Sequence, residues 1–342
     1  MTIDMHAHWK PPALIEVLRN RSTEPRIVTN DDGVEVFRTR RGDEPVETAF
    51  SDVEQQLADM DAHGITTGVL SLLGSFTWIQ RQPLEESLEL TRACNDGMGQ
   101  ICSAYEGRFA AFASLPEADI DAAAQEFERA LGLPGVIGAQ VPGNAFLTLK
   151  DAEAMRPIME VANAHKALVF IHFGPRMGDD WPRVAPDADN NRRRMGTLDM
   201  QASLSSNMVT LCMTDFLAPY PDANIQIHNL GGNIPYEMER MDHRCLLDTP
   251  DEELPSRRFR ESSVYVDCNS FGPHAIEAGI RAYGEDRIVY GTDGTAFGAD
   301  WTNKALDEAN ISDAAKQKIR HDNAAGMLSH LVPIAQYGQA AE

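Results

Sequence analysis

The sequence predicts an α/β fold, namely a (β/α)8 TIM barrel with a small β insertion after its first strand. Short apolar segments with strand character alternate with helical segments along the chain, and eight such strands can be counted. Near-continuous apolar strands that alternate with helices indicate a parallel sheet covered on both faces. Eight strand–helix units in 342 residues favour a closed barrel. An open doubly wound sheet is the alternative, although no GxGxxG or GxxxxGK[ST] motif follows any strand.

The expected strands are short and mostly apolar, and they cover residues 3–6, 65–73, 109–115, 135–141, 167–173, 225–228, 264–268 and 288–291. Helical periodicity predicts helices at 13–19, 51–62, 84–105, 120–131, 149–164, 197–217, 235–247, 274–283 and 313–331. The second of these helices has Ser51 as its expected N-cap and Glu54 three residues later, which is the pattern of a capping box.

Residues 26–50 have a different character from the alternating units around them. They are polar, they contain the turn signal Asn30-Asp31-Asp32-Gly33, and a strand-like segment follows that turn. We expect this segment to be a small β insertion over the mouth of the barrel. Residues 1–342 are otherwise interpreted as a single domain.

Composition excludes several classes of protein. The net charge of −22 argues against a nucleic-acid partner, since such proteins need a basic face. The five cysteines are widely spaced and form no CxxC pair, which is typical of reduced thiols in a cytoplasmic protein. No apolar run approaches 18 residues, so no membrane span is expected, and a strand beginning near residue 2 leaves no room for a signal peptide.

Potential metal ligands stand at the ends of four expected strands. The first strand ends in His6-Ala7-His8, the fifth in His172, the sixth in His228, and the eighth runs into Asp293. Two histidines at i and i+2 share one face of a strand, and the carboxyl ends of barrel strands meet at one rim. Any one of these residues alone is more often structural, but four at the same rim indicate a metal site with nitrogen and oxygen ligands.

These motifs resemble the amidohydrolase superfamily, in the branch that contains aminocarboxymuconate semialdehyde decarboxylase and related aromatic-acid decarboxylases. The resemblance rests on Ile3-Asp4-Met5-His6-Ala7-His8, Met60-Asp61-Ala62-His63-Gly64-Ile65, Phe170-Ile171-His172, His228 with Gly231-Gly232, Glu285 to Asp293, and Asn323-Ala324. It departs from the branch after His228, where Asn229-Leu230 precede the glycines, and after Asp293, where Gly294-Thr295-Ala296-Phe297 replace an aromatic-Pro pair.

The resemblance implies one divalent metal ion, Zn²⁺ or alternatively Mn²⁺, bound by His6, His8, His172 and Asp293. It implies that His228 is a catalytic base beside the metal and that Asp293 also takes part in catalysis. A single ion is expected because the fourth strand, which ends in Gln140-Val141, carries no lysine or carboxylate that could bridge two ions.

Substrate contacts are expected from three further residues. The resemblance places a carboxylate-binding arginine in the insertion, where Arg38 fits best within the cluster Arg38, Arg40 and Arg41. It also places an arginine near Arg240 that reaches a substrate carboxylate across a homodimer interface built from residues 235–247. Trp181, after the fifth strand, is expected to cover an aromatic substrate.

The function expected from the resemblance is metal-dependent, non-oxidative decarboxylation of an aromatic or unsaturated carboxylic acid. A metal-dependent hydrolase or hydratase with the same site, acting on a small carboxylated intermediate of aromatic catabolism, is the alternative. A barrel that only binds its ligand is a third reading, which the intact ligand set disfavours. A clamp of several arginines favours the decarboxylase, because it suits a small anionic substrate.

Overall fold

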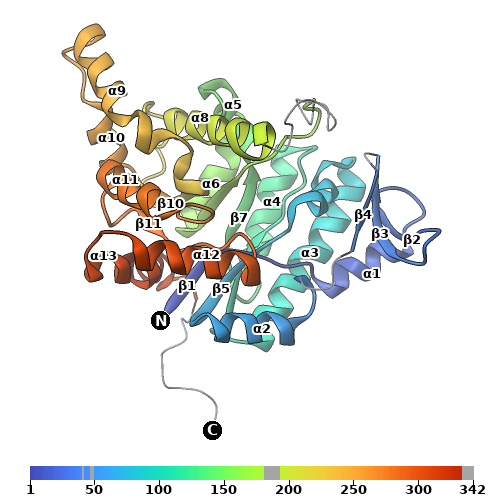
Figure 1. Ribbon diagram of the computed structural model, residues 1–342. Helices are drawn as coiled ribbons and strands as arrows, with labels where there is room; N and C mark the ends of the chain where they lie inside the picture. Colours follow the sequence, from blue (N-terminus) through green and yellow to red (C-terminus); the bar gives the residue numbers. More distant parts are fainter. Residues whose placement is uncertain (41, 47–49, 181–192, 333–342) are drawn as a thin grey trace.

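The computed structural model describes residues 1–40, 42–46, 50–180 and 193–332 of the chain (Figure 1). Eight parallel strands form one sheet in the order β1-β5-β6-β7-β8-β9-β10-β11. Their bounds are Thr2–His8, Ile65–Ser71, Phe109–Ala113, Val136–Pro142, Leu168–His172, Asn224–Ile227, Val264–Asp267 and Ile288–Val289. All eight expected strands are therefore present.

Backbone hydrogen bonds between the last strand and the first close the sheet into a barrel. The amide of Met5 in β1 donates to the carbonyl of Tyr290 at 2.9 Å, and the amide of Asp293 donates to the carbonyl of His6 at 2.8 Å. This closure confirms the (β/α)8 barrel and excludes the open doubly wound alternative. It also brings the end of β11 beside the histidines of β1.

The helices surround the barrel, as Figure 1 shows. They are α1 (Pro12–Asn20), α2 (Val53–Ala62), α3 (Leu84–Ala104), α4 (Ile120–Ala130), α5 (Leu149–Glu153), α6 (Arg156–His165), α8 (Met200–Cys212), α9 (Ile234–Asp248), α10 (Pro255–Glu261), α11 (Pro273–Tyr283), α12 (Thr295–Glu308), α13 (Asp313–Gln317) and α14 (Asn323–Leu328). A 3-10 helix, η2 (Gly74–Arg81), follows β5.

Three details of the helices differ from the expectation. The single helix expected over 149–164 is wrong: it is divided into α5 and α6, and Pro157 lies in the first turn of α6. Ser51 is not the N-cap of α2, because the side chain of Asp52 accepts the hydrogen bond from the amide of Gln55. Helices α10, α12 and η2 were not expected at all.

The interior of the barrel is a packed apolar core that supports the rim. Met5, Val69, Phe112 and Phe170 are among its buried side chains, and the Phe112 and Phe170 rings stack with centroids 5.0 Å apart. Above them, the Phe170 ring lies 4.9 Å from the ring of His6. The histidines at the rim are therefore seated on the barrel core, which fixes their positions.

Helix α14 closes the opposite end of the barrel. Its Ala324, Met327 and Leu328 join the interior core, and the Asn323 side chain donates to the carbonyl of Ile288 at the beginning of β11. The packed end and the polar rim are thus at opposite ends of the strands, as in other barrels of this class.

The insertion is a separate antiparallel sheet of β2 (Arg26–Thr29), β3 (Glu35–Thr39) and β4 (Gly42–Pro45), which confirms the expected β structure. It lies beside α1 in Figure 1. Phe37 in β3 is fully buried and stacks on Phe76 of η2, with ring centroids 4.2 Å apart. This contact joins the insertion to the rim of the barrel.

Within the described ranges, no helix combines the length and the apolar composition that crossing a membrane requires.

Candidate metal centre

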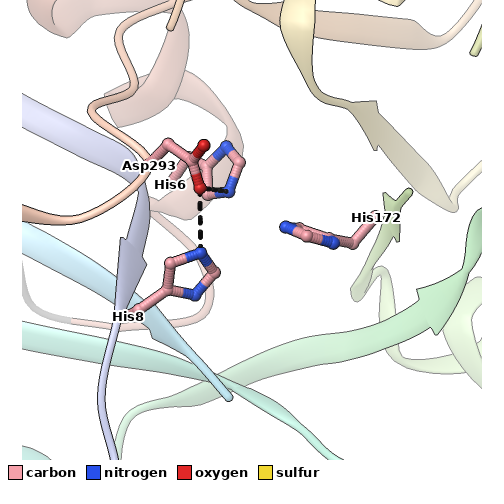
Figure 2. Close-up of side chains that lie close together, drawn as sticks. All are labelled: His6, His8, His172 and Asp293. Atoms are coloured by element: carbon pink, nitrogen blue, oxygen red, sulfur yellow. Dashed lines mark hydrogen bonds and ion pairs between the residues drawn. The ribbon is translucent and has the colours of Figure 1, made fainter. Parts of the chain in front are cut away.

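The rim of the barrel brings four of the predicted ligands together. His6 and His8 come from β1, His172 is the last residue of β8, and Asp293 follows β11. One ligand atom from each side chain lies within 4.8 Å of those from the other three. Figure 2 shows His6, His8 and Asp293 in contact and the His172 ring facing them from the other side. The in-register strand ends produce this convergence.

Each of the three histidines is held through its Nδ1 atom. His6 Nδ1 lies 3.1 Å from the Asp267 carboxylate, which can only accept a hydrogen bond when ionised. His172 Nδ1 donates to its neighbouring backbone carbonyl at 3.0 Å, and His8 Nδ1 lies 3.0 Å from the hydroxyl oxygen of Ser71. An imidazole that donates through Nδ1 presents the lone pair of Nε2 to a metal, and such partners orient metal-binding histidines.

The three Nε2 atoms face one another and Asp293, and among the described residues only that of His8 has a hydrogen-bond partner, Asp293 Oδ1. Those of His6 and His172 are buried, and no described residue forms a hydrogen bond with either. The nearest acceptor is Asp293 Oδ1, at 3.3 Å from His6 Nε2 and 3.0 Å from His8 Nε2. Buried polar atoms without partners are rare in native proteins. Three converging nitrogens and a carboxylate therefore fit one divalent cation.

The pKa directions differ among the ligands and follow from burial and from the neighbouring charges. Burial lowers the pKa of His6, but the carboxylates of Asp267 and Asp293 outweigh it and raise the pKa to about 10. Burial raises the pKa of Asp293, yet His6 and His8 hold it well below the ordinary value. Burial and the neighbouring His6 lower the pKa of His172 to about 3, which keeps the ring neutral, the form that binds a metal.

A backbone conformation and a neighbouring side-chain contact place the Asp293 side chain. Its φ is +60°, a left-handed conformation that aspartate adopts more readily than most residues. The preceding Thr292 is tied to the first strand, because its hydroxyl donates to the buried Asp4 carboxylate at 2.7 Å. Asp4 was not predicted as part of the site, although it belongs to the motif Ile3-Asp4-Met5-His6-Ala7-His8.

His228 lies next to the four ligands, as expected from its strand. Its ring stacks on that of His172 with centroids 4.5 Å apart and an interplanar angle of 8°. Its Nε2 accepts the backbone N–H of Phe173 at 2.8 Å, whereas its buried Nδ1 has no partner among the described residues. Burial lowers the pKa of His228 well below its ordinary value, and His172 and His6 lower it further. The ring is thus neutral and carries its proton on Nδ1.

A cavity of about 360 Å³ opens on one side of the centre. His172 forms part of its wall, and the other polar wall residues are Glu44, Thr77, Gln80, Arg81 and Gln140. The cavity lies between the β8 rim, η2 and the edge strand of the insertion. Its volume suits a small ring compound rather than a polymer.

The three expected substrate contacts lie in different places. Arg38 forms a bidentate ion pair with Asp43 on the exposed side of the insertion, and it is not among the residues that line the cavity. Arg240 lies exposed on α9. Trp181 lies outside the residues that the structure describes.

Three residues near the site were not predicted from the sequence. Asp267 and Asn269 come from the end of β10 and the following turn, and both contact His6 Nδ1, at 3.1 and 2.8 Å. Arg81 lines the cavity from η2, a helix that was not expected. A search for polar residues at every strand end, including β10, would have found the first two.

Comparison with known proteins shows the family. The amidohydrolase family model matches residues 3–329. A gamma-resorcylate decarboxylase of Rhizobium radiobacter is 28% identical over 286 residues, which are 79% of this chain and 85% of that protein. A 2-amino-3-carboxymuconate-6-semialdehyde decarboxylase of Dictyostelium discoideum is 23% identical over 253 residues, 71% of this chain and 66% of that protein. The expected superfamily and branch are thereby confirmed.

A solved structure with the same fold is a dihydroxybenzoic acid decarboxylase from Polaromonas sp. JS666, crystallised with manganese and the inhibitor 2-nitroresorcinol. It superimposes with a TM-score of 0.70 at 21% identity, over 96% of each chain. These relatives are carboxy-lyases, the class of enzyme that the resemblance implied.

Proposed function

This chain belongs to the amidohydrolase family, and we propose that it is a metal-dependent, non-oxidative decarboxylase of an aromatic or unsaturated carboxylic acid. The observation that carries this proposal is the cluster of His6, His8, His172 and Asp293, whose ligand atoms converge beside a cavity. The decarboxylase names of the curated relatives support the reaction class.

One divalent ion would be held by these four side chains. Zn²⁺ suits three imidazoles and a carboxylate, and manganese is bound in the related dihydroxybenzoic acid decarboxylase. When bound, the ion supplies Lewis-acid stabilisation of negative charge on substrate oxygens. Gln140, at the end of β7, lines the cavity where a second ion would need a charged bridging ligand, which supports a single ion.

His228 acts on the substrate through Nδ1. Because its Nε2 already accepts the Phe173 N–H, the neutral ring offers a proton donor and no free lone pair. A donor placed beside the ligands stabilises negative charge that develops on a substrate oxygen when the carbon–carbon bond to CO₂ breaks. This role refines the base expected from the resemblance, and the two roles are separated by the variants described in the Discussion.

We infer that Asp293 returns a proton to the ring carbon that loses CO₂. Its side chain is 35% exposed, whereas that of His6 is fully buried, so Asp293 is the more accessible of the two to a substrate. Its low pKa keeps it ionised at rest. Any proton that it delivers is therefore taken up within the catalytic cycle and moved over a short distance.

The proposed function is tested by supplying hydroxybenzoates, muconates and lactones to the protein loaded with Zn²⁺ or Mn²⁺. Decarboxylation predicts loss of an aromatic or unsaturated acid together with release of CO₂. Ring opening of a lactone, or hydration of a double bond without CO₂, would instead establish the hydrolase or hydratase alternative.

We further propose that the protein is a two-fold homodimer that uses α9. This helix projects from the barrel in Figure 1, and the apolar side chains of Tyr236, Leu246 and Leu247 on it are more than half exposed. A second copy of the same helix would cover these side chains in an isologous contact.

The insertion is proposed to be part of the same domain as the barrel, since Phe37 packs on Phe76.

Arg240 tests whether this interface completes the active site. No described residue forms an ion pair with Arg240, whereas the nearby Arg244 pairs with Asp248. If Arg240 binds the substrate of the partner subunit, Arg240→Ala should raise KM for an acidic substrate by roughly 10–100-fold, the value of a charge-assisted hydrogen bond. Arg244→Ala is the matched control and should change KM little. Steady-state kinetics measures both.

Mixing Arg240→Ala with His8→Ala subunits extends this test. One site of each mixed dimer would then have both an intact metal centre and an arginine from its partner, so activity should return. Failure to regain activity after subunit exchange has been demonstrated would contradict a role of Arg240 in the partner's site.

A further inference from the structure

Arg81 is a buried cation in the wall of the cavity that adjoins the candidate metal centre. It is the last residue of η2, and its side chain is only 6% exposed. A Cβ atom built on Gly174 would lie 3.9 Å from Arg81 Nη2, so the guanidinium lies beside the segment that follows His172. Arg81 and His172 therefore line the same cavity from different elements.

Glu117 positions Arg81 and leaves part of its guanidinium unused. The Arg81 Nε donates to the Glu117 carboxylate at 3.1 Å, and that carboxylate also accepts the backbone N–H of Met177. Among the described residues, none accepts a hydrogen bond from either Nη group of Arg81. A guanidinium has five donors in a fixed planar fork that matches a carboxylate. The Nη donors are thus available to an anion in the cavity.

The surroundings of Arg81 add positive charge on the same side. The guanidinium carbons of Arg81 and Arg40 lie 5.0 and 4.9 Å from the centre of the Trp78 ring. Trp78 also lines the cavity, and a second cavity of about 230 Å³ is bounded by all three residues. Two guanidinium groups thus lie on this side of the cavity, together with Glu117, which pairs with Arg81, and Glu24, which lines the second cavity.

Two other polar side chains of the cavity are consistent with such a ligand. Glu44 also lines the cavity, but it is exposed, so its repulsion of an anion is screened by solvent and salt. Gln140 is 5% exposed, and its Oε1 has no hydrogen-bond partner among the described residues. A hydroxyl or protonated group on the ligand would satisfy it.

From this arrangement we propose that Arg81 binds a second acidic group of the substrate, remote from the carboxyl group that is lost. The preferred substrates are then aromatic dicarboxylic acids, with one carboxylate directed to the metal centre and the other to Arg81. The inference rests on the proposed function in one respect only, namely the identity of the carboxyl group that is lost as CO₂. The recognition of two anionic groups rests on the cavity itself.

The test compares the binding of benzene-1,3-dicarboxylate and benzoate to the metal-loaded protein by isothermal titration calorimetry. The wild-type protein should bind the dicarboxylate at least about 10-fold more tightly than benzoate. In Arg81→Gln the dicarboxylate should bind roughly 10–100-fold more weakly, while the affinity for benzoate changes little. Equal weakening of both probes, or no weakening of either, would overturn the proposal.

Controls separate recognition from disturbance of the fold. Arg81→Gln leaves Glu117 buried without its partner, so the double variant Arg81→Gln/Glu117→Gln removes both charges and should show the same loss of discrimination. Glu117→Gln alone keeps the positive charge of Arg81 but removes the carboxylate that positions it, so the preference for the dicarboxylate should fall by less than in Arg81→Gln. Arg19→Gln, which breaks an exposed arginine–glutamate pair with Glu35, should leave both affinities unchanged.

The competing residue is Arg38, the arginine expected from the resemblance. Selective loss of dicarboxylate binding in Arg38→Gln, with normal binding in Arg81→Gln, would assign the second acidic group to the insertion and contradict the proposal. Because the test measures the binding affinity of both probes, its outcome does not depend on catalysis. Discrimination through Arg81 without release of CO₂ from any acid would contradict only the proposed function.

Discussion

His8→Ala is expected to remove the bound divalent ion and to lower turnover by at least about 10³-fold, while the barrel remains folded. The loss follows because Lewis-acid stabilisation of the transition state is worth several kcal/mol. The fold persists because His8 lies at the rim, whereas the interior core is built from residues such as Phe112 and Phe170. Elemental analysis of the purified proteins should find one ion per wild-type chain and none in the variant.

Two matched variants sharpen this expectation. Ser71→Ala removes the partner of His8 Nδ1 and a hydrogen bond to the Ala7 carbonyl but leaves every metal ligand in place, so it should weaken metal affinity by about 10–100-fold rather than abolish it. His63→Ala alters a histidine that pairs with Asp300 on the outside of the barrel, so it should keep both the ion and the activity. Retention of a full equivalent of metal in His8→Ala would show that the four-residue cluster is not the binding site.

His228→Ala is expected to keep the ion and to lower the turnover rate by roughly 10²–10⁴-fold, the range for removal of a group that donates or accepts a proton. The ion should stay because no other ligand is changed, and the stacked ring of His172 keeps its own hydrogen bond to Phe173 O. Rates measured at saturating substrate, alongside metal analysis, separate the two effects. Loss of metal in this variant would make His228 a fifth ligand.

His228→Gln then distinguishes a donor from a base. A glutamine amide supplies an N–H donor but cannot take up a proton near neutral pH. If Nδ1 of His228 works as a donor, His228→Gln should recover part of the activity that His228→Ala loses. Equal inactivity of both variants would favour the general base that the resemblance implied.

The metal ligands could be predicted because parallel barrel strands place their ends at one rim. His6, His8, His172 and Asp293 each close an apolar run, so reading the strands was enough to bring them together in space. Asp267 also closes a strand, but no histidine or carboxylate stands near it in the sequence at a spacing typical of metal ligands. Its role in holding His6 depends on a contact between residues 261 positions apart.

The walls of the cavity were harder to predict than the metal ligands. Arg81 belongs to a 3-10 helix of eight residues whose apolar positions have no clear helical period, so η2 was not recognised. In the insertion, neighbouring residues of a strand point to opposite faces. Phe37 packs on Phe76 on the side of the cavity wall residue Glu44, so Arg38 lies on the other face, where it pairs with Asp43. Which face a short strand buries depends on the surface that it packs on.

The missed helix α12 has a similar explanation. Its sequence, Thr295–Glu308, contains Gly298 and two threonines, which are weak helix formers, and its apolar residues do not form one stripe. Packing against α2 and α11 stabilises it in the folded protein. Local propensity alone therefore could not reveal it, although the (β/α)8 pattern requires a helix at this point in the chain.

The most direct test of metal-dependent decarboxylation uses an aromatic acid labelled with ¹³C in its carboxyl group, chosen from the substrate screen. Without oxygen, the metal-loaded protein should release ¹³CO₂ in step with loss of the acid. A chelator should stop the release, added Zn²⁺ or Mn²⁺ should restore it, and Asp293→Asn should show none. Consumption of the acid with the label retained in the product, or ¹³CO₂ release that a chelator does not affect, would contradict the proposed function.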